Sequence, residues 1–92
     1  MKIINHEVNG LKISQRRLDG YINLTQMAKA YNKRVYNWLR LKDTEDLLQE
    51  FEYQEKLNNS DVSDLKPALI VKRGKHEGGT WGHPDIAIQF AQ

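Results

Sequence analysis

Residues 22–42 read INLTQMAKAYNKRVYNWLRLK, and the rest of the chain is organised around this stretch. At 100° per residue, one narrow helical stripe of its first half carries Leu24, Met27, Ala28 and Tyr31. Asn23 or Thr25 can cap this helix, because a side-chain oxygen can accept from its unpaired first amides. Asn32 stands where the helix should end, since asparagine tolerates the left-handed backbone that terminates helices. The stretch predicts two short helices joined by a tight turn.

The second of these helices has two chemically different sides. One side is apolar, is expected to be buried, and carries Val35, Trp38 and Leu39. The opposite side carries Lys33, Tyr36, Asn37 and Arg40. Arginine can bond bidentately to guanine, asparagine to adenine, and lysine to phosphate. This side is typical of a DNA recognition helix, and also of an ordinary amphipathic helix with a solvated basic face.

The formal net charge of +2 hides a strongly polarised chain. Residues 1–42 hold nine Lys or Arg against two acids, whereas residues 43–64 hold eight acids against one Lys. Residues 65–92 hold four basic and two acidic residues. Because the field at a surface depends on how charge is arranged, the basic part favours an anionic partner.

Length and composition exclude several classes of protein. Ninety-two residues make one domain with a modest core. The absence of cysteine excludes disulfides and cysteine-ligated zinc. No stretch approaches the ~18 apolar residues of a membrane span, and the first residues lack a signal peptide's apolar run. Nucleotide-binding fingerprints and metal-ligand spacings are also absent, so we expect no cofactor, no metal and no membrane partner.

An N-terminal β-hairpin is predicted around Asn9-Gly10. This dipeptide separates two β-rich runs, residues 2–8 and 11–16, and both of its residues accept the positive φ of a type I′ turn. Asp19-Gly20 marks a second turn, after which Tyr21-Ile22 can form a short strand.

Residues 43–58 predict a third, acidic helix with Asp43 as its cap. Its apolar side is expected to carry Leu47, Leu48, Phe51 and Leu57. Carboxylates along it could suggest acid catalysis or a divalent metal, but a solvated face explains Glu45, Asp46, Glu50 and Glu52 better. This helix should face away from nucleic acid, because its charge would repel phosphate.

A second hairpin is predicted after Pro67. A strand over residues 68–72 leads into RGKHEGGT, and Trp81 is expected to start the return strand. The glycines permit a tight turn and close approach to a partner. The exposed basic residues of this hairpin are Lys72, Arg73, Lys75 and His76. They could contact an anionic partner or belong to a flexible surface hairpin.

His83-Pro84-Asp85 is a helix-start signature, and it predicts a last helix with Ile86, Ala87 and Phe90 inward. His83 is expected to cap or pack, not to catalyse. The sequence ends inside this apolar element, so we expect residues 1–92 to be a single domain of a longer protein, with further domains after Gln92.

Taken together, these motifs resemble the KilA-N domain, a DNA-binding module of phage, bacterial and large DNA-virus proteins that is similar to the fungal APSES domain. The resemblance covers nearly the whole chain. The segments that carry it are residues 19–23 (DGYIN), 37–39 (NWL), 78–81 (GGTW) and 83–85 (HPD).

The resemblance implies an α+β, winged helix-turn-helix-like fold without enzymatic activity, and double-stranded DNA as the partner. It places Lys33, Arg34, Tyr36, Asn37 and Arg40 at the recognition helix, and Lys72, Arg73, Lys75 and His76 on the wing. Lys42 is expected to hold the DNA backbone or minor groove together with the wing. Tyr21, Trp38 and Trp81 are expected in the core. By analogy, the protein would be a phage or viral transcription regulator in the cytoplasm of a bacterium or phage-infected host.

Three other functions remain open at this point. The acidic helix could make the chain a protein-interaction module. A nuclease would have to use His76, Glu77 and His83, whose spacing fits no metal set. Single-stranded nucleic acid needs exposed aromatic platforms, and only Tyr36 is well placed for that.

Overall fold

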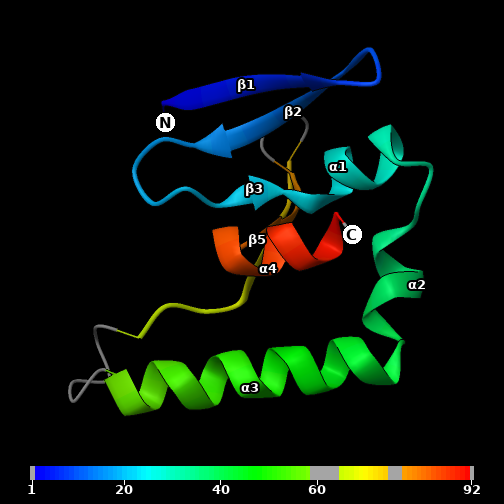
Figure 1. Ribbon diagram of the computed structural model, residues 1–92. Coiled ribbons are helices and arrows are strands. Elements are labelled where there is room, and N and C mark those ends of the chain that lie inside the picture. Colours follow the sequence, from blue (N-terminus) through cyan, green and yellow to red (C-terminus); the bar gives the residue numbers. More distant parts are fainter. Residues whose placement is uncertain (1, 59–64, 75–77, 92) are drawn as a thin grey trace.

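The structure, a computed structural model, describes residues 2–58, 65–74 and 78–91 of the 92-residue chain. Within these ranges it has five strands in one antiparallel sheet and four helices, so the predicted α+β class is confirmed. The sheet order is β1–β2–β3–β5–β4, with β1 (Ile3–Val8), β2 (Leu11–Arg16), β3 (Ile22–Asn23), β4 (Leu69–Lys72) and β5 (Gly79–Gly82). The helices are α1 (Leu24–Ala30), α2 (Val35–Leu39), α3 (Lys42–Asn58) and α4 (Pro84–Phe90) (Figure 1).

The N-terminal hairpin is confirmed, and its turn has the predicted geometry. Asn9 and Gly10 have φ values of 53° and 79°, and Val8 pairs with Leu11. The Asn9 side chain also donates from Nδ2 to the carbonyl of Ala30 at 2.8 Å. The turn is thereby attached to the end of α1.

Helix α1 begins and ends at local signals. Asn23, and not Thr25, is its cap: Oδ1 accepts from the amide of Gln26 at 3.0 Å. Asn32 has a φ of 56°, the left-handed value that its position predicts. Tyr31 was expected on the buried stripe but is exposed, because it follows the last helical residue as the C-cap.

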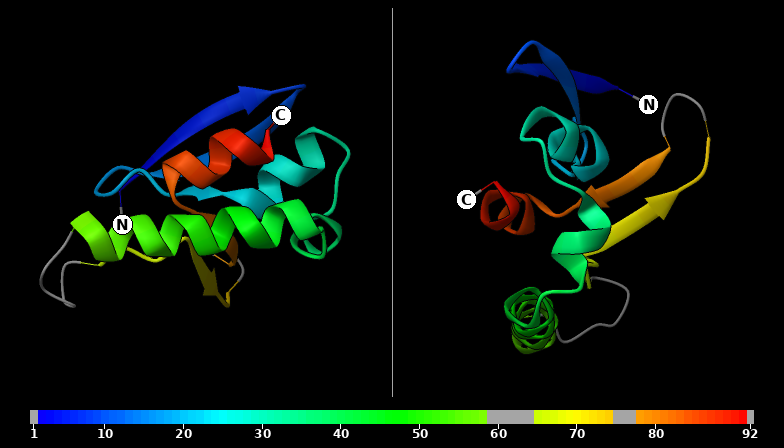
Figure 2. Two further views of the ribbon diagram at one scale, coloured as in Figure 1. Left: turned by 60° about the horizontal axis from the view of Figure 1, so that its bottom comes forward. Right: turned by 90° about the vertical axis from the view of Figure 1, so that its right-hand side faces the viewer.

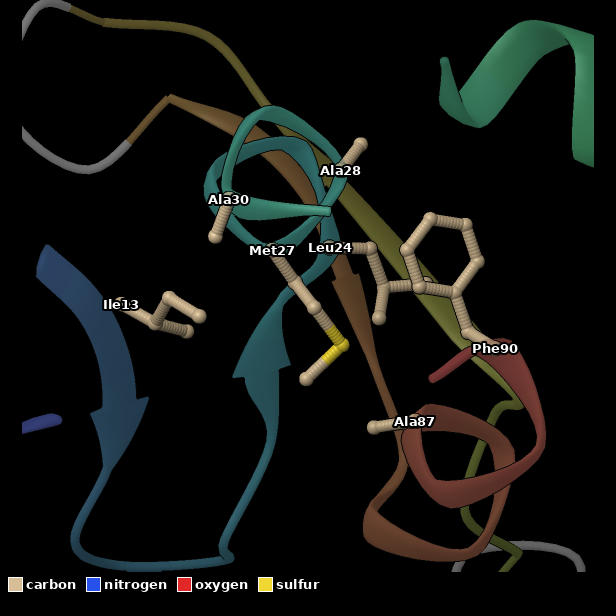
Figure 3. Close-up of a cluster of buried hydrophobic side chains, with 7 residues drawn as sticks. All are labelled: Ile13, Leu24, Met27, Ala28, Ala30, Ala87 and Phe90. Atoms are coloured by element: carbon tan, nitrogen blue, oxygen red, sulfur yellow. The ribbon is translucent and has the colours of Figure 1, made fainter. Parts of the chain in front are cut away.

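The core lies between α1, α4 and β2. Figure 3 shows Leu24 and Met27 pointing from α1 toward the side of α4 that carries Ala87 and Phe90. Phe90 is fully buried, and the ring of Trp38 packs edge-on against it with centroids 4.9 Å apart. This contact holds α2 against α4. Two other aromatic side chains expected in the core are buried, namely Tyr21 and Trp81.

The start of α4 agrees with its sequence signature. Pro84 takes the first helical turn, and Nδ1 of His83 accepts from the amide of Asp85 at 3.1 Å. The imidazole also packs against Tyr21 and Phe51, with ring centroids 5.5 Å and 4.7 Å away. His83 is therefore the cap and packing residue that the sequence predicts. The inward residues of α4 are also confirmed as Ile86, Ala87 and Phe90.

Helix α2 is shorter and less buried than predicted. It begins at Val35 with Arg34 as its N-cap, so Lys33 precedes the helix. Its apolar side chains are only half-buried, because a helix of five residues at the edge of the core has few neighbouring side chains to cover it. They are Val35, Trp38 and Leu39.

Helix α3 ends at Asn58 as predicted, but its start and the burial of Leu57 differ from the prediction. It begins at Lys42, since the carbonyl of Leu41 already accepts from the amide of Glu45 at 3.0 Å, and Asp43 lies inside the first turn. At the other end, Leu57 was expected on the apolar side but is 62% exposed. The last turn of α3 extends past the end of α4, so α4 does not cover it (Figure 1).

The second hairpin is confirmed in its pairing, with small changes in its bounds. Strand β4 begins at Leu69, not at residue 68, and β5 begins at Gly79, two residues before Trp81. The earlier start follows from the register, in which Lys72 pairs with Gly79 and Val71 with Thr80. Among the described residues, none of the helices combines the length and the apolar character that a membrane span requires.

Candidate nucleic-acid interface

A hollow of about 510 Å³ opens between α1 and the start of α2. It forms because Asn32 turns the chain sharply, so that the end of α1 and the start of α2 face the same space. Its polar lining consists of Thr25, Lys29, Asn32, Lys33, Arg34 and Tyr36. Three of these side chains are cationic and none is acidic, which makes the hollow a basic concave surface.

A second hollow of about 420 Å³ adjoins the first along α2. Lys33 and Arg34 line both hollows, so this pair forms the basic ridge between them. The second hollow is completed by Asn37, Trp38 and Leu41. The two hollows together give a continuous surface from α1 to the end of α2.

The polar side of α2 is exposed as predicted. Tyr36 is 69% exposed, and Asn37 and Arg40 also face solvent. The guanidinium of Arg40 lies over the ring of Tyr36, 5.4 Å from its centroid. Cation–π contact of this kind restrains a long side chain without neutralising it. Arg40 is thus presented to a partner in a partly ordered position.

Two of the predicted site lysines have partners within the protein. Nζ of Lys33 donates to the carbonyl of Phe90 at 3.2 Å and lies 5.6 Å from the centroid of its ring. Nζ of Lys42 lies 3.2 Å from Oδ1 of Asp46, and the hydrogen bond to this carboxylate raises the pKa of Lys42. Part of the field of each amine is directed toward these partners.

We call the hairpin of β4 and β5 the wing, and we include in it the described residues next to these strands, Arg73, Gly74 and Gly78. Lys72 is half-buried at the end of β4, and Arg73 is exposed directly after it. Lys75 and His76 lie outside the described residues. Figure 2 (right) shows the wing extending from the sheet to the side away from α4.

The wing is hydrogen-bonded to the start of α1 near the end at which Lys72 pairs with Gly79. The amide of Thr80 donates to Oγ1 of Thr25 at 3.1 Å, and Nδ2 of Asn23 donates to the carbonyl of Gly78 at 3.3 Å. Thr25 also lines the first hollow. The wing and the α1–α2 surface are therefore parts of one connected structure.

The acidic helix lies apart from α1. Figures 1 and 2 both show α2 between α1 and α3. The exposed carboxylates of α3 include Glu45, Asp46, Glu50 and Glu52. A nucleic acid on the α1 side of α2 would be separated from most of this negative charge.

The structure adds Lys29, which the sequence prediction missed. Its exposed side chain lines the first hollow from the last turn of α1. A signal was present, because Thr25, Lys29 and Asn32 recur at i, i+4 and i+7 and so share one polar face.

The residues suggested for a nuclease do not gather into a metal site in the described part of the chain. His83 uses Nδ1 to cap α4, and His76 and Glu77 lie outside the described residues. Within residues 2–58, 65–74 and 78–91, no group of three or more His, Cys, Asp or Glu side chains could hold a metal ion.

Comparison with known proteins gives one match. A family described as the KilA-N domain matches residues 6–92, which is almost the entire chain. Neither the curated proteins nor the solved structures contain a significant match.

Proposed function

The chain belongs to the KilA-N domain family, whose members are generally DNA-binding, and on this premise we propose that it is a double-stranded DNA-binding module without enzymatic activity. The observation that supports this proposal most directly is the basic surface that runs from the first hollow, between α1 and α2, along α2. Its cations are suited to phosphate, and its exposed arginine and asparagine are suited to base edges.

The proposed docking places α2 in the major groove. A helix of five residues is only about 7.5 Å long, which is less than the ~12 Å width of the groove. Asn37 and Arg40 then face base edges, while Arg34 reaches the flanking phosphates. Lys33 joins Arg34 there by exchanging its hydrogen bond to Phe90 for one to phosphate. Lys29 extends this phosphate contact onto α1.

The wing completes the proposal as a winged helix-turn-helix-like arrangement. Lys72 and Arg73 of the wing hold the DNA backbone or the minor groove, together with Lys75 and His76 from the segment between its strands. Lys42 contributes a further backbone contact at the start of α3. By analogy with the family, the protein acts as a phage or viral transcription regulator in the bacterial cytoplasm.

Fluorescence anisotropy tests the proposal with a labelled random-sequence duplex and the matching single strand, each at low and high salt. We expect the duplex to bind more tightly than the single strand, and its binding to collapse at high salt because counterions are released from neutralised phosphates. Equal or tighter binding of the single strand would instead favour stacking of bases on the exposed ring of Tyr36.

A thermal melt of the same sample gives the control for folding. A cooperative melt together with no duplex binding at low salt would overturn the proposal, and would favour a protein partner for the acidic face of α3. A variant with Glu45, Asp46 and Glu50 reversed to lysine would then test that second role directly. We expect this variant to bind duplex DNA at least as tightly as the wild type, because it removes negative charge.

A further inference from the structure

The wing lies against the start of α1 at both ends of β5: Gly82 is next to Leu24, and Gly79 is next to Thr25 and Asn23. Strand β5 pairs with β3 through Gly82 and Trp81, opposite Ile22 and Asn23. Beyond that point Thr80 of β5 is hydrogen-bonded to Thr25, and Gly78, which directly precedes β5, is hydrogen-bonded to Asn23. The β3–β5 pairing fixes one end of β5, and these hydrogen bonds fix the other end, where Lys72 pairs with Gly79.

Asn23 and Thr25 do not contribute to this junction in the same way. Asn23 is 1% exposed and also caps α1, so its replacement would disturb the helix as well as the wing. Thr25 lies inside the first turn, and its hydroxyl accepts from Thr80 across 55 positions of sequence. Thr25 is therefore the residue at which the wing contact can be changed while the cap is kept.

We propose that Thr25 is a positioning residue for DNA binding, whose hydroxyl holds the wing where Lys72 and Arg73 can reach a duplex that is bound along α2. This inference rests on the proposed function. Binding with two separated surfaces gains affinity only when both can engage the ligand at once. A wing whose outer end is held less firmly would lose part of that gain, because its cations would have to be ordered during binding.

Two other roles for Thr25 make different predictions. Because Thr25 lines the hollow, its hydroxyl could contact DNA directly. Alternatively, its hydrogen bond could serve only the stability of the fold. In either case, the loss of the hydroxyl would weaken binding by the same factor whether or not the wing is charged. If Thr25 positions the wing, loss of its hydroxyl should weaken duplex binding only when the wing still carries its cations.

The test is a double-mutant cycle in duplex affinity. Thr25→Val replaces the hydroxyl by a methyl group of similar size, and Thr25→Ser keeps the acceptor. We expect Thr25→Val to weaken duplex binding about three- to tenfold in the wild type, and less than about twofold in a Lys72→Ala/Arg73→Ala background. In an Arg40→Ala background, Thr25→Val should weaken duplex binding by the same factor as in the wild type. Thr25→Ser should bind like the wild type.

Asn9→Gly provides a matched control at the other end of α1. It removes one side-chain hydrogen bond to the helix, from Asn9 Nδ2 to Ala30 O, and glycine accepts the φ of 53° at that position. We expect no coupling between Asn9→Gly and the wing variant. Amide hydrogen exchange adds a readout without DNA: Thr80 should lose protection in Thr25→Val and keep it in Asn9→Gly.

The outcomes separate this inference from the proposed function. If folded wild-type protein does not bind duplex DNA, the proposed function fails and the positioning role fails with it. If the wild type binds but Thr25→Val has the same effect in both backgrounds, or none in either, only the positioning role is overturned. The positioning role is likewise overturned if Thr25→Ser binds as weakly as Thr25→Val.

Discussion

A side chain at Gly79 would collide with Thr25: a Cβ atom built on Gly79 lies 2.9 Å from Oγ1 of Thr25. Gly79 also has a φ of 122°, a backbone conformation that L side chains rarely adopt. Steric crowding and backbone conformation thus both require glycine here. The second glycine of the GGTW motif can be understood as the residue that lets the wing approach α1 closely enough for the hydrogen bond between Thr80 and Thr25.

Gly79→Ala is therefore expected to destabilise the domain by about 2–4 kcal/mol, from strained backbone and a displaced Thr25. Gly10→Ala is the matched control, because Gly10 also has a positive φ, 79°, but a Cβ there would meet nothing within 4 Å. Its expected cost is smaller, about 1 kcal/mol. Urea unfolding of the three proteins measures the difference, and equal losses for both variants would show that close packing on Thr25 is unimportant.

Arg40→Ala should weaken duplex binding by about 1–3 kcal/mol if Arg40 reads a base edge. Glu52→Ala, on the exposed side of α3, should change binding little and serves as the control. Anisotropy titrations with one duplex measure both variants. A loss in Glu52→Ala as large as that in Arg40→Ala would place the binding site on α3 instead.

Salt should reduce duplex affinity steeply. Four to seven phosphate contacts from the basic residues of α1, α2 and the wing predict a log–log slope near −4 to −6. Removing one contact, as in Arg73→Ala, should reduce the magnitude of this slope by about one. The measurement is a series of affinities between about 50 and 200 mM salt, a range over which such slopes are resolved. A slope near zero would contradict binding through phosphates.

The stability of the domain should fall in acid through Asp19. Burial opposes ionisation of this carboxyl, but hydrogen bonds from the Arg16 side chain and the amide of Tyr21 outweigh it, so the pKa of Asp19 lies below 3.8. A lowered pKa contributes stability that is present above the unfolded pKa and is lost as pH falls through the folded one.

Asp19→Asn should accordingly be about 1–3 kcal/mol less stable than the wild type at pH 7, because charged hydrogen bonds are lost. The difference should shrink below about pH 4, where the wild-type carboxyl becomes protonated. Unfolding curves at pH 7 and at successively lower pH measure this difference. If the difference in stability between the wild type and Asp19→Asn stayed constant with pH, the charge of Asp19 would not stabilise the fold. Glu52→Gln, on a solvent-exposed face of α3, is the control and should leave the stability at pH 7 nearly unchanged.

The features that could be predicted from sequence are those with local causes. The turn at Asn9-Gly10, the cap at Asn23 and the start of α4 at Pro84 each depend on φ values and hydrogen bonds within a few residues. The errors also have local causes. The start of α3 shifted by one residue because a backbone carbonyl, that of Leu41, can begin a helix without a side-chain cap.

By itself the sequence determined the order and type of the elements, the polar side of α2 and the basic character of the N-terminal part. Only the tertiary structure decided which polar groups share a surface. Lys33 bonds to Phe90 across 57 positions, and Thr25 bonds to Thr80 across 55. Helix and turn signals act over a few residues, whereas these contacts exist only after the core has brought α1, α4 and the wing together. For that reason the role of Lys29 in the hollow and the attachment of the wing to α1 emerged only from the folded chain.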